Sequence, residues 1–305
     1  MNGIVCINKP PAFTSFDVIA KARGILRLRK MGHAGTLDPM ATGVLPVFLG
    51  GATKAIGLME DHDKEYVATL RLGMETDTQD VWGTVTRTAP PADERALEAV
   101  LPRFRGEIWQ TPPMYSAVQV GGRRLYDLAR AGVEVECPAR KIAVYALELL
   151  GPGEAPGEYR LRVRCSKGSY IRTLCADIGA ALGCGGAMAA LCRTHSCGFS
   201  LSDCVTLEQL QALRDTGAPF PVLPLARAFP DLPQLTVTRK QAARFLCGAP
   251  LAAERLKRPV EGRALVFAPD GTLLGLGEAA EEALRPVKLF CAREEFLAGA
   301  DGTQA

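Results

Sequence analysis

The 305-residue sequence has neither the long apolar runs nor the paired cysteines that are typical of membrane, secreted and zinc-binding proteins. No stretch approaches the roughly 18 consecutive apolar residues of a membrane-spanning helix. The N-terminus lacks the basic start and apolar core of a secretion signal, so we expect a cytoplasmic protein that contacts no membrane. Ten cysteines occur without one Cys-x-x-Cys, which predicts free thiols in a reducing compartment and no bound metal. The closest cluster of possible metal ligands is Cys192, His195, Cys197 and Cys204.

Motifs for nucleotide cofactors are also missing. There is no Walker loop, and no Gly-x-Gly-x-x-Gly follows an apolar strand. The net charge is only +3, so composition by itself does not indicate nucleic acid, and any basic surface must come from local clustering. The hydrophobic share of 48% and the charged share of 23% are typical of a globular protein with one large domain and a small one.

One twelve-residue stretch, Gly32–Gly43, contains most of the chemistry that remains. It has one Asp, one His, two Thr and three Gly, and its apolar residues recur at neither helical nor strand spacing, which predicts a structured loop. Pro39 restricts the backbone directly after Asp38. No second acid suggests a two-carboxylate glycosidase. Asp38 is therefore a candidate nucleophile or base without a cofactor, although spacing alone favours a simple turn residue.

Hydrophobic periodicity indicates that the chain contains both strands and helices. Apolar or alternating runs indicate strands over residues 4–7, 44–49, 66–72, 159–165 and 187–194. Capping residues indicate helices that begin after Thr14, Asp93 and Thr206. The buried side of the first helix is expected to consist of Phe16, Ile19, Ala20 and Leu26.

The pattern of residues 111–145 predicts a protruding hairpin with a basic edge. The alternative is a solvated surface loop without a binding role. We expect a strand over 115–120, a short helix over 125–131 and a strand from 141. Five prolines over 219–233 predict a linker. The expected domains are therefore residues 1–228, with this insertion, and a small β-rich unit over 233–295.

Several motifs follow one another in a definite order. They are Asn8-Lys9-Pro10 with Thr14-Ser15, the stretch Gly32–Gly43, Lys64-Glu65-Tyr66, Ser166-Lys167-Gly168-Ser169-Tyr170-Ile171-Arg172 and Leu191-Cys192-Arg193-Thr194. Together they resemble the bacterial tRNA pseudouridine-55 synthases, the TruB family, over essentially the whole chain. Small departures occur at Ala12, Ser169 and Cys192. The resemblance implies an α+β pseudouridine synthase fold, with a mixed, mostly antiparallel sheet flanked by helices. It also implies that residues 111–145 are a thumb insertion and that the C-terminal unit is a PUA-like, β-barrel-like RNA-binding domain.

The resemblance also implies an activity. The protein would isomerise uridine 55 in the T-loop of tRNA to pseudouridine, without cofactor or metal, after flipping the base out of its stack. Asp38 stands at the position of the family's catalytic Asp. Arg172 is expected to pair with Asp38 and keep it ionised. Tyr66 is expected to stack on the uracil and is a candidate to take the C5 proton.

The remaining expected contacts bind substrate. His33 is expected to occupy the space that the flipped base leaves, Tyr170 to pack against uracil or ribose, and Leu191 to form an apolar wall. Lys9 is expected to support the active-site loops and Lys54 to reach phosphate, with a solvated surface lysine as the alternative for both. Further candidate RNA contacts are Thr42, Arg123, Arg124, Arg140 and Lys141.

Two other functions remain open at this stage. The guide-RNA-dependent pseudouridine synthases share the Asp loop, but the thumb insertion and the lack of a long basic tail argue against them. A tRNA-folding chaperone with dispensable catalysis is the alternative of another class. The expected partner is the tRNA T-stem-loop, bound by a monomer that needs no protein partner.

Overall fold

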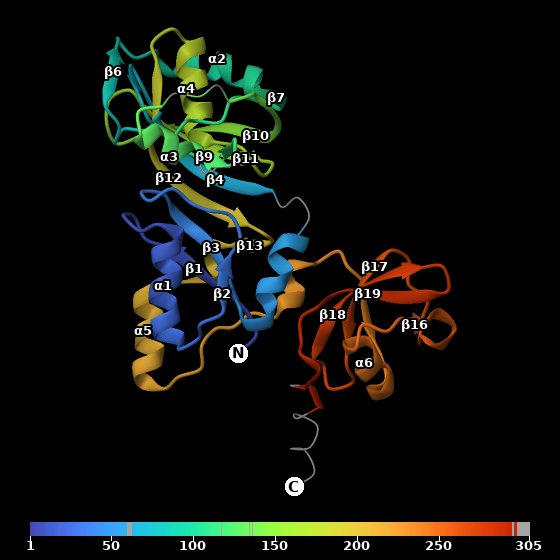
Figure 1. Ribbon diagram of the computed structural model, residues 1–305. Helices are drawn as coiled ribbons and strands as arrows, with labels where there is room; N and C mark the ends of the chain where they lie inside the picture. The colour runs from blue at the N-terminus through green and yellow to red at the C-terminus, as the bar shows by residue number, and fades with distance from the viewer. Residues whose placement is uncertain (60–62, 117, 134, 136, 295, 298–305) are drawn as a thin grey trace.

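The computed structural model describes residues 1–59, 63–116, 118–133, 135, 137–294 and 296–297, and it contains two β-sheet units (Figure 1). The larger sheet has ten strands, in the order β14-β1-β3-β12-β4-β11-β10-β7, with β2 and β13 paired at its sides. Two pairs, β1 with β14 and β3 with β12, are parallel and the rest are antiparallel, so the expected mixed, mostly antiparallel sheet is confirmed. The strands of this sheet are β1 (Gly3–Lys9), β2 (Met31–His33), β3 (Thr42–Leu49), β4 (Lys64–Leu72), β7 (Gly106–Gln110), β10 (Arg140–Pro152), β11 (Glu158–Cys165), β12 (Gly186–Ser196), β13 (Phe199–Ser200) and β14 (Cys204–Val205).

Helix α1 (Ser15–Leu26) begins at the expected cap. The Thr14 hydroxyl accepts from the Asp17 backbone N–H at 3.0 Å, and the Asp17 carboxylate accepts from the Thr14 N–H at 2.9 Å. The expected buried side was wrong, because Phe16 is 65% exposed and Ala20 is exposed too. The buried stripe is instead set by the residues that face β1 and β3, namely Val18, Ile19, Ala22, Ile25 and Leu26.

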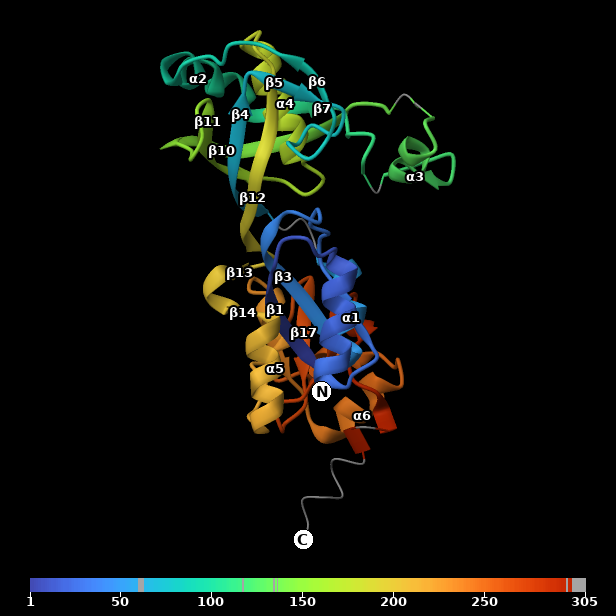
Figure 2. The same cartoon turned by 90° about the vertical axis from the view of Figure 1, so that its left-hand side faces the viewer.

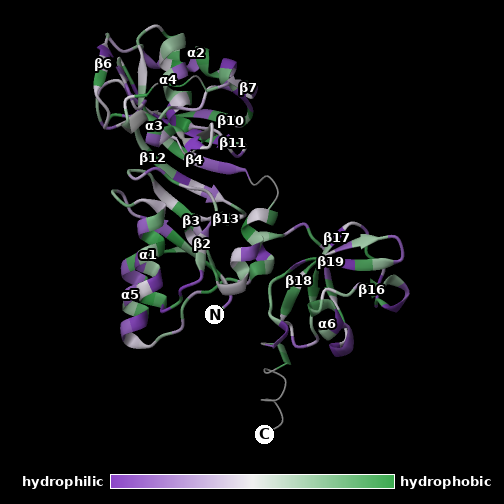
Figure 3. Ribbon diagram, viewed as in Figure 1, coloured by the Kyte–Doolittle hydropathy of each residue, from purple (hydrophilic) through white to green (hydrophobic). Residues whose placement is uncertain are grey.

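The half of the sheet around β1 and β3 is covered on both faces. Helices α1 and α5 (Leu207–Thr216) cover one face and carry both hydrophilic and hydrophobic residues, as amphipathic helices do (Figure 3). On the other face, Ile4 and Phe48 pack with Leu225 and with Phe290 of the C-terminal unit. The expected linker is therefore not a free tether. Its residue Leu223 exchanges two backbone hydrogen bonds with Ile4, at 2.9 and 2.7 Å.

The other half of the sheet packs against α2 (Glu94–Val100) and α4 (Ile171–Ala181). The predicted alternation of β4 is confirmed, because Tyr66, Ala68, Leu70 and Leu72 are all buried. The two halves are paired directly by β3 and β12, where Thr42 lies opposite Cys192 and Gly43 opposite Arg193. The stretch Gly32–Gly43 therefore enters the sheet at the seam between its halves.

The thumb segment leaves the sheet after β7 and carries α3 (Leu125–Arg130) away from the body of the molecule (Figure 2). The expected strand over 115–120 is reduced to the short β8 (Gln119–Val120), which pairs with β9 (Arg123–Arg124). Arg140 and Lys141 lie outside this excursion. They begin β10 and face Gln110 and Trp109 of β7 in the main sheet.

The smaller sheet has five strands, in the order β15-β17-β18-β19-β16, with α6 (Arg239–Leu246) packed against it. Its strands are β15 (Gln234–Thr236), β16 (Leu251–Ala252), β17 (Arg263–Phe267), β18 (Leu273–Ala280) and β19 (Ala283–Leu289). A short hairpin, β5 (Met74–Thr76) with β6 (Val85–Thr88), completes the strands. Within the described part of the chain, no helix is long and apolar enough to cross a membrane.

Gly43 provides a test of the seam. Its φ is +103°, and a β-carbon at this position would lie 2.2 Å from the carbonyl oxygen of Arg193. We expect Gly43→Ala to lower the free energy of unfolding by more than about 3 kcal/mol, because strain and a backbone clash add together. Denaturant unfolding followed by circular dichroism measures this.

The matched control is Gly24→Ala. Gly24 lies within α1, and a β-carbon there would meet nothing within 4 Å. This change should raise stability by about 0.5–1 kcal/mol, since alanine is the better helix former. If Gly43→Ala were as well tolerated as Gly24→Ala, the seam would not constrain the fold.

Candidate active site

Asp38 lies in the loop between β2 and β3, and both of its neighbours in sequence are held by β1 and α1. The Ser15 hydroxyl accepts from the Leu37 N–H at 2.9 Å, and the Lys9 ammonium donates to the Pro39 carbonyl at 2.7 Å. Lys9 donates to two further carbonyls and is fully buried, so it is not a solvated surface lysine. The predicted loop is therefore anchored on each side of Asp38.

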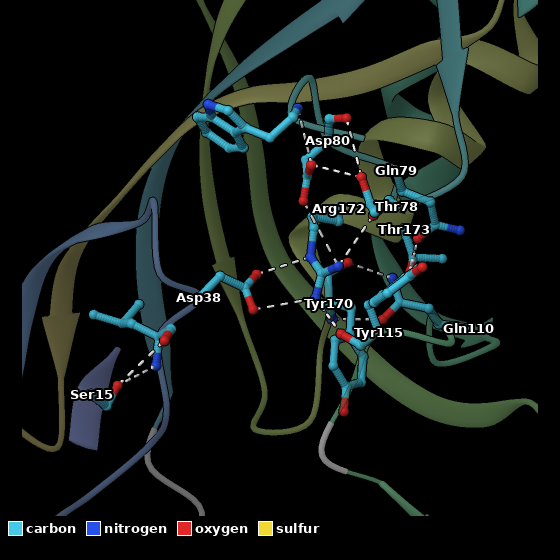
Figure 4. A network of polar contacts seen from close by, with 12 residues as sticks. Ser15, Asp38, Thr78, Gln79, Asp80, Gln110, Tyr115, Tyr170, Arg172 and Thr173 are labelled. Atoms are coloured by element: carbon cyan, nitrogen blue, oxygen red, sulfur yellow. Dashed lines mark hydrogen bonds and ion pairs between the residues drawn. The ribbon is translucent and has the colours of Figure 1, made fainter. Parts of the chain in front are cut away.

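Arg172 holds the Asp38 carboxylate through two hydrogen bonds. Its Nε lies 2.9 Å from Asp38 Oδ2, and its Nη2 lies 3.2 Å from Asp38 Oδ1 (Figure 4). The Arg172 side chain is 5% exposed, whereas that of Asp38 is 39% exposed. A buried guanidinium thus presents an accessible carboxylate in a fixed orientation, which is the geometry a nucleophile or base needs.

Three further groups fix Arg172, and sequence reasoning missed all of them. Its Nη1 donates to the Thr78 carbonyl at 3.1 Å, and its Nη2 donates to the Tyr115 carbonyl at 2.8 Å. Asp80 Oδ2 lies 3.9 Å from Nη1. The two aspartates of Asp77-Thr78-Gln79-Asp80 are typical of a turn. Nothing in the sequence connected this turn to Arg172, which lies more than ninety positions later.

Gln110 was also missed, and it positions Tyr170. Its side-chain amide accepts from the Tyr170 N–H at 2.7 Å and donates to the Tyr170 carbonyl at 3.0 Å. Gln110 is 2% exposed, so this contact is sheltered from water. Tyr170 is the residue before the first turn of α4, two positions before Arg172, and it is half-buried.

Tyr66 faces the same side of the sheet as Arg193, which lies directly opposite it on β12. Burial raises the pKa of Tyr66 to about 12, and the neighbouring Arg193 acts in the opposite direction. Arg193 is fully buried and donates to the carbonyls of Val44 at 2.8 Å and Gly35 at 2.9 Å. Arg193 therefore connects the Tyr66 strand with the Asp38 loop.

The remaining expected residues near the loop are His33, Thr42 and Leu191. His33 is half-buried in β2, and its pKa is lowered, mainly by burial, so its imidazole is neutral at pH 7. Its Nδ1 is buried and has no hydrogen-bond partner among the described residues. The Thr42 hydroxyl donates to the carbonyl of the buried Leu191 at 3.4 Å.

Several expected RNA contacts lie elsewhere. Lys54, in the 3-10 helix Gly50–Leu58, donates to the Leu289 carbonyl of the small sheet at 3.0 Å. Lys141 pairs with Glu107 at 2.8 Å in the main sheet. Arg123 is exposed on the thumb and Arg140 at the start of β10, whereas the side chain of Arg124 falls outside what the structure describes.

Known proteins match the chain over nearly its full length. Residues 23–171 match the family model described as TruB family pseudouridylate synthase (N terminal domain), and residues 172–219 match that of the tRNA pseudouridylate synthase B C-terminal domain. The tRNA pseudouridine synthase B of Syntrophomonas wolfei is 44% identical over 95% of this chain and 99% of that protein. The chain belongs to the TruB family.

Other relatives agree with this family. The tRNA pseudouridine synthase B of Geobacillus kaustophilus is 43% identical over 89% of this chain and 98% of that protein. Among solved structures, a chain of a Cbf5-Nop10-Gar1 complex is similar with a TM-score of 0.72 and 28% identity, over 96% of this chain and 86% of that chain. The expected pseudouridine synthase fold is thereby confirmed for this TruB-family chain.

Lys9 gives a pH-dependent test of the loop anchor. Burial lowers its pKa from 10.5 to about 8. Because the unfolded chain then binds this proton more tightly than the folded chain, stability rises with pH between these two values. The difference in free energy of unfolding between wild type and Lys9→Met should grow by about 1–2 kcal/mol from pH 7.5 to 9.5. Urea unfolding at both pH values measures it, and a constant difference would contradict the shifted pKa.

Proposed function

We propose that this TruB-family protein isomerises uridine 55 in the T-loop of tRNA to pseudouridine. The C1′–N1 bond breaks, the base turns, and a C1′–C5 bond forms; C5 loses a proton and N1 gains one, so no cofactor is needed. The observation that carries the proposal is the accessible Asp38 carboxylate held at two oxygens by the buried Arg172. The relatives named tRNA pseudouridine synthase B support tRNA as the substrate.

Asp38 acts on the sugar or the base of a flipped uridine. A carboxylate fixed in this way can attack C1′ or C6, or assist elimination to a glycal, and in each case Arg172 keeps its oxygens aimed while the bond changes. A stacked uridine does not reach the loop, so the base must first leave the stack. The neutral imidazole of His33 suits the space that the base leaves, because it stacks without the desolvation cost of a charge.

Tyr66 serves as the stacking face for the uracil. With a pKa of about 12, its hydroxyl is almost entirely protonated at neutral pH and does not accept a proton in the resting enzyme. Removal of the C5 proton by Tyr66 would require the deprotonated hydroxyl, which Arg193 favours from the opposite strand. Tyr170 and Leu191 complete the apolar surroundings of the base.

Contacts outside the site are assigned to the rest of the RNA. Residues 1–228 form the catalytic domain, and residues 233–295 form the PUA-like domain that contacts the acceptor-stem side. The thumb over 111–145 closes on the T-loop, with Arg123 and Arg124 as phosphate contacts on the excursion itself and Arg140 and Lys141 as further phosphate contacts at its base, where β10 begins. Lys9 and Thr42 support the catalytic loop, and Lys54, at the junction with the small sheet, reaches phosphate.

We favour the proposal that this protein modifies tRNA alone, as a cytoplasmic monomer, over the alternative that it depends on a guide RNA. The named tRNA enzymes are 40–44% identical to this chain, whereas the similar chains of an H/ACA RNP and of a Cbf5-Nop10-Gar1 complex are 27% and 28% identical. Incubation of the purified protein with a T-stem-loop transcript tests this choice. We expect one pseudouridine per transcript without any other RNA or protein. A requirement for either would favour the guide-RNA-dependent class.

Asp38→Asn separates catalysis from binding. The amide keeps the shape and one acceptor oxygen but removes the charge, so we expect pseudouridine formation to fall by at least about 10⁴-fold. The dissociation constant for the T-stem-loop should change by less than about threefold. Product is measured by nucleoside mass spectrometry after digestion, and binding by filter retention.

Unchanged turnover by the Asp38→Asn variant would remove Asp38 from the mechanism. A variant that no longer bound the stem-loop would instead indicate that the ion pair with Arg172 supports the RNA surface. The control is Asp231→Asn, at an exposed position in the segment before the small sheet, which should alter neither measurement.

A further inference from the structure

Arg193 is a buried cation without an acidic partner. Its side chain, on β12, is fully buried, and among the described residues its guanidinium donates to the carbonyls of Val44 and Gly35 and to no carboxylate. Buried charges are normally paired, because an isolated charge is costly in a nonpolar interior. Two carbonyls need N–H donors but no full charge, so these contacts do not account for the choice of a cation at this position.

One donor of this guanidinium is also unused. Nη1 of Arg193 is buried and makes no hydrogen bond with any residue that the structure describes. A β-carbon on Gly35 would lie 3.2 Å from this Nη1 and 3.4 Å from Cε of Lys64, so the unused donor lies close to the face of β4 that carries Lys64. Tyr66 lies on the same face, two positions farther along the strand. The unused donor and Tyr66 are therefore in the same part of the site.

The anion that would complete Arg193 has to arise inside the protein. A phosphate at the surface of the protein cannot touch a guanidinium that is fully buried. The Asp38 carboxylate is held by Arg172 instead. Tyr66 lies directly opposite Arg193 in the register of β4 and β12, and its hydroxyl becomes an anion when it loses its proton.

The other groups around Tyr66 oppose this ionisation. Burial raises the pKa of the Tyr66 hydroxyl to about 12, and Cys165 on β11 and Asp38 in the loop act in the same direction. Among the influences that lower this pKa, the charge of Arg193 is the largest. Lys64 is half-buried on the same strand, and burial lowers its own pKa. Arg193 is therefore the main source of stabilisation for a Tyr66 anion.

We propose that Arg193 is a positioning residue that acts through Tyr66: its free Nη1 binds the Tyr66 oxygen when the hydroxyl loses its proton, which makes a tyrosinate available to remove the C5 proton. The inference rests on the proposed function and assigns the proton transfer within it. RNA need not contact Arg193 for this role, which agrees with its full burial.

The proton transfer balances within the site. Once C5 has bonded to C1′, the C5–H bond has to break and N1 has to gain a proton. The Tyr66 hydroxyl gives its proton to N1, and the tyrosinate, held by Arg193, takes the proton from C5. The electron pair of the C5–H bond forms the C5–C6 double bond, and Tyr66 ends protonated, as it began. A hydroxyl that keeps its proton in the resting enzyme suits this sequence of events.

Deuterium at C5 of the target uridine reports on this step. The experiment compares kcat for pseudouridine formation on T-stem-loop transcripts with ¹H or ²H at C5. Arg193→Gln keeps a donor but removes the charge, so it should lower kcat by about 10²-fold and increase the isotope effect above the wild-type value, because removal of the C5 proton becomes slower. Arg193→Lys keeps the charge and should retain more of the rate than Arg193→Gln.

A double-mutant cycle tests whether Arg193 acts through Tyr66. On the Tyr66→Phe background, Arg193→Gln should lower kcat by less than about threefold further, because the hydroxyl that it serves is gone. Lys9→Met is the matched control, since Lys9 is also fully buried and also holds the loop, at Pro39. It should lower kcat by the same factor on both backgrounds and leave the isotope effect no larger than in wild type.

Two measurements protect the test against silent failures. Circular dichroism shows whether each variant is folded, and if Arg193→Gln is not, Arg193→Lys takes its place and should still increase the isotope effect. If the Tyr66→Phe background is too slow to measure, the isotope effect decides by itself.

The outcomes separate this inference from the proposed function. If the Arg193 variants lower kcat without increasing the isotope effect, or lower it equally with and without the Tyr66 hydroxyl, Arg193 only supports the loop and the inference is wrong. Equal losses in Arg193→Lys and Arg193→Gln would show that the charge has no role and would overturn it as well. If wild type forms no pseudouridine on the stem-loop, the proposed function itself is wrong.

Discussion

The ion pair between Arg172 and Asp38 joins two parts of the protein that the backbone connects only at a narrow seam. Asp38 belongs to the half of the sheet that carries α1, and Arg172 begins α4 in the other half. Strands β3 and β12 pair at only two positions, so side chains must complete the connection. Arg172 makes this connection although it is buried. In addition to Asp38, the carbonyls of Thr78 and Tyr115 and the carboxylate of Asp80 satisfy its guanidinium. The reactive group and the alignment of the two halves therefore depend on the same contact.

Buried cations perform a similar task along the rest of the catalytic loop. Lys9 and Arg193 are both fully buried, and each donates to backbone carbonyls of the loop or of β3 instead of to acids. Both ends of Gly32–Gly43 belong to the strands β2 and β3, and long side chains help to order residues 34–41 between them. Two buried atoms at this place, His33 Nδ1 and Arg193 Nη1, have no partner among the described residues. Unsatisfied buried donors and acceptors are costly, so these two atoms lower the stability of the protein at this place.

Local signals in the sequence predicted the elements well where one face is buried, as in the alternation of Tyr66 to Leu72 and the cap at Thr14. They were wrong for Phe16 and Ala20, since periodicity alone admits more than one face of α1 and the packing against β1 decides between them. The pairing of Asp38 with Arg172 followed from the resemblance to a family, not from spacing. Gln110 and Asp80 had no such guide. Their contacts depend on segments brought together by the tertiary fold, and no local pattern encodes which polar residue will meet a backbone group far along the chain.

Charge is distributed around the site in a way that the overall charge of +3 conceals. Arg172 lies close to two carboxylates, Asp38 at 2.9 Å and Asp80 at 3.9 Å. Lys9 and Arg193, the buried cations close to the loop, donate to internal carbonyls. We therefore assign the attraction for phosphate to exposed basic residues farther out, such as Arg123 and Arg140. We propose that the RNA phosphates stay at these exposed residues while the target base enters the interior. An enzyme that must act on one base within a uniform polyanion gains selectivity from this separation, because only an unstacked base can satisfy the acceptors that the interior presents.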